Sequence, residues 1–370
     1  MTYTGAKINL DVETIENGLE NPEWPMLAAG PCSAESEEQV METARQLAAT
    51  KRISVYRAGI WKPRTRPNMF EGVGVIGLPW LQRVKKELGL RIATEVATPE
   101  HVELALKYGV DILWVGARTS ANPFSVQAIA DALKGSDVAV WVKNPVNPDV
   151  QLWIGALERI NSAGINKIAA IHRGFSSHEK SVFRNAPMWN IPIELKAACP
   201  NLPIICDPSH ICGNTELIPM ITQKALDLDM NGLMIECHNN PPTALSDAKQ
   251  QLTPEQYGSM IYDLILRSAT AMTAADAGSL LNELRKDIDA FDDDMIQKLS
   301  LRMKTVQKIG EYKRNINLTI LQMTRWSDIV QKRIATGQAM GLSEAFLKKL
   351  LDLIHQESIN IQTEILNKNS

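Results

Sequence analysis

The sequence of 370 residues predicts an α/β fold, a closed (β/α)8 TIM barrel, followed by a smaller all-α domain of three helices. Between residues 25 and 272, short apolar or β-branched runs alternate with longer segments of helical periodicity. Eight such units in roughly 250 residues are typical of a closed barrel, whereas an open doubly wound sheet would show a switch point. Beyond residue 272 neither a strand pattern nor a proline occurs, which predicts a separate helical domain.

The predicted strands are the apolar runs of this alternation, which suits a parallel sheet buried on both faces. They are expected at residues 26–30, 53–59, 91–96, 111–118, 138–144, 167–174, 202–210 and 232–238. The segments after them often begin at Ser or Pro and end at Gly, as helices do.

The domains are predicted at residues 1–272 for the barrel and 279–370 for the helices, with the small, polar segment 273–278 as the linker. Apolar residues recur every three or four positions from Leu280 to Leu299, which predicts one amphipathic helix over about 279–313.

The segment RNINLTI then ends the long helix. A second helix is expected over about 322–336, and a third after Gly341, with Ser343 as its N-cap.

Composition excludes several classes of protein. A net charge of −3 and a pI of about 6.1 do not provide the basic field of a nucleic-acid-binding protein. No window reaches the roughly 18 apolar residues of a membrane span, and the first residues lack a secretory pattern, so we expect a cytoplasmic protein. The five cysteines are an odd number beside apolar runs and are expected to be core residues or metal ligands.

Charged and ligand-type side chains gather at the C-terminal ends of the predicted strands, where such barrels carry their active sites. These residues are Cys32, Arg57, Lys62, Arg64, Thr65, Glu95, Arg118, Lys143, His172, Arg173, Asp207, His210, Glu236 and Asp247. So many cations at one mouth would repel one another unless anions neutralise them. The bound molecules should therefore carry phosphate or carboxylate groups.

Four of these residues form a candidate metal site: Cys32, His210, Glu236 and Asp247. They follow strands one, seven and eight, which are neighbours in a closed barrel. Mixed sulfur, nitrogen and oxygen ligands suit Mn²⁺, Fe²⁺, Co²⁺ or Zn²⁺ better than Mg²⁺ or Ca²⁺, and ligand type alone does not choose among the four. We take Mn²⁺ as the first candidate.

The ordered motifs of the barrel resemble those of 3-deoxy-D-arabino-heptulosonate 7-phosphate (DAHP) synthase, the first enzyme of the shikimate pathway and of aromatic amino acid biosynthesis. The motifs are AGPCS (29–33), KPRT (62–65), GAR (116–118), VKNP (142–145), HRGF (172–175), CDPSH (206–210), IECH (235–238) and ALSDAKQ (244–250). The resemblance implies a transferase that condenses phosphoenolpyruvate with erythrose 4-phosphate, with the four ligands holding a Lewis-acidic metal.

The resemblance also implies residue roles. Phosphoenolpyruvate would be held by Arg118, Lys143 and Arg173, with Arg57, Lys62 and His172 also at the substrates. Erythrose 4-phosphate would be bound by Arg64 and Thr65. Lys62 would protonate the forming alkoxide, and Glu95 would orient the attacking water. The related KDO-8-phosphate synthases usually have a KANRSS-like motif where this chain has KPRT, which disfavours them.

The tail resembles the all-helical chorismate mutases, which are isomerases, in residues 284–313 and in QESINIQ (356–362). The resemblance implies that chorismate and prephenate bind there, through Arg285, Arg302, Lys313, Arg325, Ser358 and Gln362. Lys313 and Gln362 would be catalytic, because they can stabilise charge on the ether oxygen.

Helix geometry predicts a homodimer. Arg302 and Lys313 are about 16 Å apart along a helix and can face one small dianion. Arg285, about 42 Å from Lys313 on a continuous helix, would have to serve the site of another chain.

Two functions of the tail stay open. Gln322 and Trp326 stand where these mutases usually have acidic residues, which predicts weakened rearrangement. The first hypothesis is a bifunctional, allosteric enzyme whose helical domain is a mutase and also mediates inhibition by prephenate or chorismate. In the second, the tail is only a ligand-sensing dimerisation module for the barrel.

Overall fold

The computed structural model describes residues 7–13, 16, 19, 24–62, 69–178, 180–267, 275–321 and 323–367, apart from the side chains of 275–279 and 323–328. The chain divides into two compact units, Met1–Ala269 and Thr270–Ser370. Among the described residues, no helix has the length and apolar character that crossing a membrane requires.

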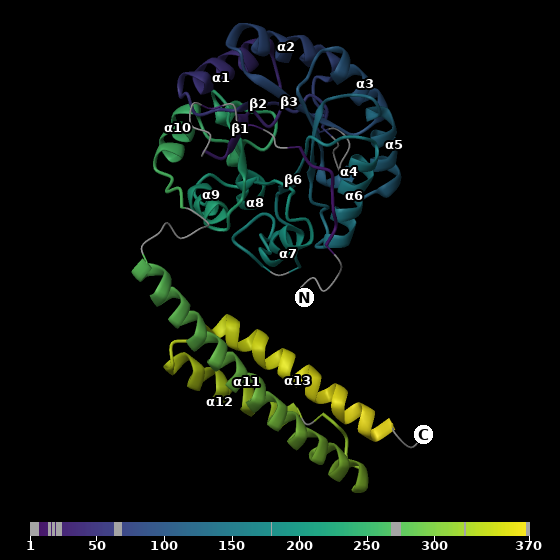
Figure 1. Ribbon diagram of the computed structural model, residues 1–370, viewed down its shortest axis with the longest axis vertical. Coiled ribbons are helices and arrows are strands. Elements are labelled where there is room, and N and C mark those ends of the chain that lie inside the picture. Colours follow the sequence, from purple (N-terminus) through teal and green to yellow (C-terminus); the bar gives the residue numbers. More distant parts are fainter. Residues whose placement is uncertain are drawn as a thin grey trace. The chain divides into compact units, whose positions relative to one another are not determined.

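The first unit is a closed barrel of eight parallel strands, which confirms the predicted fold (Figure 1). The strands pair in chain order, and β1 closes the ring against β8. They are β1 (Met26–Gly30), β2 (Val55–Arg57), β3 (Arg91–Val96), β4 (Ile112–Val115), β5 (Ala139–Lys143), β6 (Ile168–His172), β7 (Ile204–Cys206) and β8 (Gly232–Glu236).

Helices surround the barrel (Figure 1). They are α1 (Glu37–Ala49), α2 (Gly77–Leu88), α3 (Pro99–Lys107), α4 (Ala117–Ser120), α5 (Pro123–Leu133), α6 (Val150–Ser162), α7 (Asn190–Ala198), α8 (Pro208–Cys212), α9 (Ile218–Asp227) and α10 (Pro254–Tyr262). Three short 3₁₀ helices, η1 (Gly74–Ile76), η2 (Pro241–Thr243) and η3 (Ala248–Gln250), lie in the connections.

Alternating side chains along the strands build two apolar layers. One layer lies between the sheet and the helices, and the other fills the barrel interior. Trp114 and Trp141 are opposite one another on β4 and β5, and alanines such as Ala28 and Ala93 leave room for them inside. All five cysteines are buried and free, as expected of core residues or ligands.

Several strands end earlier than predicted. The predicted strand over 202–210 is β7 followed by α8, because Asp207 accepts a hydrogen bond from the His210 backbone N–H and Pro208 opens the helix. The predicted strand over 111–118 likewise ends at Val115, and Arg118 lies in α4.

The second unit contains three helices, as predicted: α11 (Ala275–Asn315), α12 (Met323–Ala339) and α13 (Glu344–Asn367). Helix α11 begins four residues before the predicted start, so 275–278 of the expected linker are helical. Alanine, a strong helix former, occupies two of these positions. Ser343 caps α13 by accepting from the Phe346 N–H, as predicted.

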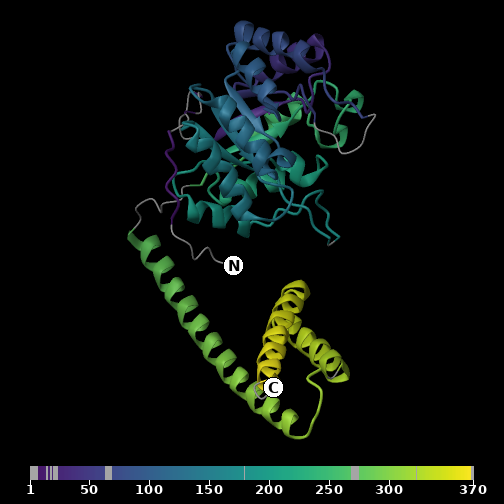
Figure 2. The ribbon, with the colours of Figure 1, turned by 90° about the vertical axis from the view of Figure 1, so that its right-hand side faces the viewer.

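Helix α13 packs along the C-terminal half of α11, and α12 packs against α13 (Figure 2).

Candidate active sites

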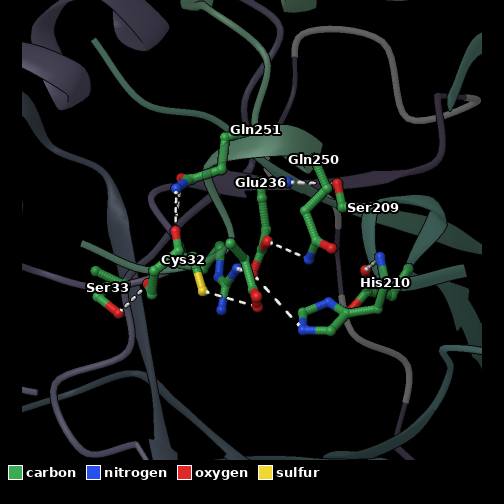
Figure 3. Close-up of polar contacts among 12 residues, drawn as sticks. Cys32, Ser33, Ser209, His210, Glu236, Gln250 and Gln251 are labelled. Carbon is green, nitrogen blue, oxygen red and sulfur yellow. Dashed lines mark hydrogen bonds and ion pairs between the residues drawn. The ribbon is translucent and has the colours of Figure 1, made fainter. Parts of the chain in front are cut away.

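A thiol and two carboxylates lie together at the C-terminal end of the barrel (Figure 3). Cys32 follows β1, Glu236 ends the neighbouring strand β8, and Asp247 lies on the loop after β8. One ligand atom from each lies within 4.8 Å of the others. The structure therefore brings together three of the four predicted metal ligands.

The fourth predicted ligand, His210, lies beside this cluster on α8. Its Nε2 is 3.8 Å from Glu236 Oε1, and its Nδ1 is 2.8 Å from Asp207 Oδ2 without hydrogen-bond geometry. Burial lowers the pKa of His210, although Asp207 opposes the shift. A neutral imidazole near pH 7 has a lone pair available for a metal.

Polar contacts fix these ligands in place. The Cys32 backbone N–H donates to Gln251 Oε1 at 2.9 Å, and the Glu236 N–H donates to Ser209 Oγ at 2.9 Å (Figure 3). Gln250 Nε2 donates to Glu236 Oε2 at 2.7 Å. The loop after β8 is thus bound to both strands that carry ligands.

The electrostatics of the cluster favour a bound cation. Burial, followed by the nearby Glu236 carboxylate, raises the pKa of the Cys32 thiol to about 11. The carboxylates stay ionised: burial opposes it, but His210 and Arg57 hold the pKa of Glu236 well below its usual value. With His210, whose Nε2 is 3.8 Å from Glu236 Oε1, the cluster offers a mixed sulfur, nitrogen and oxygen donor set that fits a divalent transition metal.

Two predicted cations touch this cluster directly. Arg57 Nη1 pairs with Glu236 Oε1 at 2.8 Å, and its guanidinium lies 4.7 Å above the Trp114 ring. Lys62 Nζ donates to Cys32 O at 2.9 Å and lies 3.1 Å from Cys32 Sγ. Burial lowers the pKa of Lys62, but Cys32 and Glu95 outweigh it, so the ammonium remains a proton donor.

A second set of predicted cations lies along β5 and after β6. Lys143 Nζ pairs with Asp207 Oδ2 at 2.8 Å, and both side chains are buried. The Arg173 guanidinium donates to Asn185 Oδ1 at 2.8 Å. Burial lowers the pKa of Arg173 to about 10, and the nearby Arg118 contributes to the same shift. Positive charge is thus crowded around Arg173.

Glu95 lies at the end of β3, against the Gly116 backbone. A Cβ at Gly116 would approach Glu95 Oε1 to 2.1 Å, so only glycine leaves room for this carboxylate. Arg118, two residues on, is exposed in α4. Arg64 and Thr65, the predicted aldehyde-phosphate residues, lie outside the described residues.

His172, an expected substrate contact, is the last residue of β6. Its ring is fully buried at the end of β6, beside Phe175 and Trp189. Burial and the neighbouring Arg173 lower its pKa to about 3. Both ring nitrogens are buried without a hydrogen-bond partner among the described residues, so the neutral ring has polar atoms that the surrounding side chains do not satisfy.

The helical unit brings three predicted residues, Arg302, Ser358 and Gln362, together on α11 and α13, and a fourth, Lys313, lies further along α11. Arg302 Nη1 donates to Ser358 Oγ at 2.7 Å, and Gln362 Nε2 donates to Ser358 O at 3.1 Å. Lys313 is buried and donates to Ile320 O, and burial lowers its pKa. Gln362 Oε1 is buried without a hydrogen-bond partner. These side chains form the candidate second site.

One further residue predicted for the second site, Arg285, stands apart from this group. Arg285 is exposed in the N-terminal half of α11, which is continuous to Asn315, so it is about 42 Å from Lys313 along the helix. The Arg325 side chain lies outside the described residues, as do Gln322 and the side chain of Trp326.

In the barrel site, sequence reasoning assigned no role to three residues that contact the predicted ligands and cations. Asp207 holds Lys143, Gln250 holds Glu236, and Arg184 contacts Asp247 at 3.0 Å. The pairing of Asp with Pro in CDPSH is a capping signal that points to Asp207. Arg184 lies 63 residues from Asp247, and no local pattern marks it.

Comparison with known proteins assigns both units. Residues 7–269 match the DAHP synthetase I family, and residues 284–363 match chorismate mutase type II. Over 238 residues the chain is 31% identical to phospho-2-dehydro-3-deoxyheptonate aldolase of Thermotoga maritima, covering 64% of this chain and 68% of that protein. Over 249 residues it is 28% identical to 2-dehydro-3-deoxyphosphooctonate aldolase of Acidithiobacillus ferrooxidans, covering 63% and 84%.

Two solved structures agree with these matches. The crystal structure of a DAHP synthase from Thermotoga maritima has a TM-score of 0.58 at 30% identity and covers 64% of this chain and 67% of that chain. A truncated form of the 3-deoxy-D-arabino-heptulosonate 7-phosphate synthase from Thermotoga maritima has a TM-score of 0.56 at 27% identity, with coverage of 64% and 84%. The chain therefore belongs to the DAHP synthetase I family, carries a chorismate mutase type II domain after its barrel, and is an enzyme of both kinds.

Proposed function

We propose that the barrel condenses phosphoenolpyruvate with erythrose 4-phosphate, forming DAHP and phosphate, with a divalent metal ion held by Cys32, His210, Glu236 and Asp247. The observation that carries the proposal is a buried thiol and two carboxylates within 4.8 Å of one another at a mouth rich in cations. When bound, the metal would act as a Lewis acid on the aldehyde, and Mn²⁺ is the first candidate.

In this proposal Arg118, Lys143 and Arg173 grip phosphoenolpyruvate, and Arg64 and Thr65 grip the phosphate of the aldose. C3 of phosphoenolpyruvate attacks the aldehyde carbon to form the new C–C bond. Lys62, protonated beside Cys32, gives its proton to the resulting alkoxide.

A water oriented by Glu95 adds to C2 of phosphoenolpyruvate, which the attack leaves electron-deficient, and releases one proton as the new C2–O bond forms. The bond between C2 and the phosphate oxygen then breaks, the new hydroxyl becomes the C2 carbonyl, and inorganic phosphate leaves with the hydroxyl proton.

The metal proposal is tested on the full chain by chelation and replacement. We expect condensation to stop when metal is removed and to return with Mn²⁺, Fe²⁺, Co²⁺ or Zn²⁺ in proportions set by the site. Cys32→Ser should lose this metal response, while Cys199→Ser, another buried thiol that ends α7 and is not part of the cluster, should keep it. Full metal-dependent activity in Cys32→Ser would contradict the proposed ligand set. Condensation with arabinose 5-phosphate in place of erythrose 4-phosphate would instead indicate the activity of the 2-dehydro-3-deoxyphosphooctonate aldolases.

For the helical unit we propose the rearrangement of chorismate to prephenate, with the dianion held by Arg302, Arg325, Ser358 and a second copy's Arg285. The buried, unpaired Gln362 Oε1 and the nearby Lys313 support a site for a polar ligand. Gln362→Ala should abolish chorismate consumption, whereas Asn360→Ala, an exposed change on the same helix, should not. Equal rates in the two variants would contradict this site.

We also propose that prephenate or chorismate bound to the helical unit inhibits condensation in the barrel. Prephenate is expected to slow condensation in the full chain, and Arg302→Gln should relieve the inhibition by weakening ligand binding. Inhibition without rearrangement would support a sensing module alone. If the full chain neither rearranges chorismate nor binds prephenate, both proposed functions of the tail are contradicted.

A further inference from the structure

Two adjacent residues between β6 and α7, Arg184 and Asn185, contact both halves of the barrel mouth. Their backbone N–H groups donate to Cys212 O and Ile211 O, at the end of the helix that carries His210. Gly213 makes this approach possible, since a Cβ there would lie 2.5 Å from Arg184 Cβ. The pair is thus held firmly against α8.

Asn185 connects the proposed anion grip to the proposed metal site. Its Oδ1 accepts from Arg173 Nη1 at 2.8 Å, and its Nδ2 donates to the backbone carbonyl of His210 at 2.6 Å. Asn185 is almost fully buried, so these two bonds are shielded from water. The position of the Arg173 guanidinium therefore depends on the position of α8.

Arg184 reaches the other ligands. Its Nη1 donates to Asp247 Oδ1 at 3.0 Å and to Gln250 Oε1 at 2.7 Å. Gln250 in turn donates to Glu236. Asp247 has a left-handed backbone, with φ of 45°, a conformation that non-glycine residues rarely adopt without support. Arg184 supplies one contact that holds this loop.

We propose that Arg184 and Asn185 are positioning residues that couple metal binding to binding of the phosphoenolpyruvate anion. The inference rests on the proposed function. A metal ion that fixes His210 and Asp247 also fixes the two residues bound to them, and Asn185 then holds Arg173 in place for the anion. Because such coupling is reciprocal, the anion strengthens metal binding by the same factor.

The test measures this coupling factor on the full chain without turnover. The Kd of Mn²⁺ is determined by titration with and without phosphoenolpyruvate, and the ratio of the two values is the coupling factor. In the wild-type protein we expect a ratio of at least about five, within the usual range for coupled sites. Asn185→Leu and Arg184→Gln should each bring the ratio toward one.

Arg83→Gln is the matched control, because Arg83 is 43% exposed against 46% for Arg184 and pairs with Glu37 and Glu87 on the barrel surface. It should keep the wild-type ratio. If the folded Asn185→Leu and Arg184→Gln proteins also keep the wild-type ratio, the inference is overturned and the proposed function is not. If the wild-type protein does not bind Mn²⁺, or if Cys32→Ser binds Mn²⁺ as tightly as the wild-type protein does, both the proposed function and the inference are contradicted.

Discussion

Asp207 is a buried carboxylate that neutralises Lys143 and contacts His210. Burial alone would raise its pKa, but His210 and Lys143 lower it well below its usual value. Asp207→Asn would leave Lys143 buried without a counter-ion, and we expect a loss of about 3 kcal/mol in the free energy of unfolding. Asp137→Asn, which breaks the exposed pair with Lys167, should cost less than about 1 kcal/mol. Urea titration followed by tryptophan fluorescence would compare the two variants. Equal losses would contradict the role of Asp207 as the counter-ion of buried Lys143.

His172 makes the stability of the barrel depend on pH. Its pKa is about 3 in the folded state, because of burial and then Arg173, against an ordinary 6.5. Between these values the unfolded chain binds a proton that the folded chain does not, so stability is retained above pH 6.5 and falls as the pH falls toward 3. From pH 7 to pH 5 the expected loss from this group is about 2 kcal/mol.

Unfolding titrations at pH 7 and pH 5 measure this loss, and the variant His172→Gln should lack that part of it. His178→Gln, which replaces an exposed histidine, should show the same pH dependence as the wild-type protein. If His172→Gln also follows the wild-type curve, the ring is not the source of the effect.

At the scale of elements, the turn from β4 into α4 makes room for Glu95. Because a Cβ at Gly116 would meet only the end of the Glu95 side chain, Gly116→Ala should move that carboxylate and leave the barrel folded. We expect at least about a tenfold lower kcat for condensation, in the range of general acid–base contributions, with little change in Tm. Gly155→Ala on α6 is the control: a Cβ there meets nothing within 4 Å, and the change should stabilise the helix by about 0.5–1 kcal/mol. Equal kcat values for Gly116→Ala and the wild-type protein would show that Glu95 takes no part in the reaction.

The order and type of these elements could be predicted because each strand and helix carries its own local pattern. The barrel, the three helices of the tail and the Ser343 cap all follow from periodicity and capping. The ends of strands were less predictable: apolar character continues past Cys206, and only the Asp207–Pro208 pair shows that the chain turns into a helix there.

The contacts that organise the site were beyond prediction from local pattern. Gln251 binds the backbone of Cys32 across 219 residues, and Arg184 reaches Asp247 across 63. Such contacts depend on how the barrel closes, and each residue by itself resembles an ordinary surface polar group.

At the scale of the whole molecule, helix α11 is longer than its partners within the unit require. It has 41 residues, about 60 Å, and large apolar side chains such as Leu284, Ile288 and Phe291 are more than 40% exposed along its first half. An exposed apolar stripe of this length is typical of an interface. A second copy of the chain would cover the stripe and bring in the distant Arg285, so we predict a dimer with two shared mutase sites.

Complementation tests this arrangement directly. Arg285→Ala and Lys313→Ala should each be inactive toward chorismate while condensing normally in the barrel. In a twofold dimer each shared site takes Arg285 from one copy and Lys313 from the other, so a mixed dimer has one intact site and one that lacks both residues. After subunit exchange at equal concentrations, random pairing should restore about a quarter of the wild-type mutase rate. If both residues act within one chain, every site in the mixture lacks one of them, and mixing restores nothing.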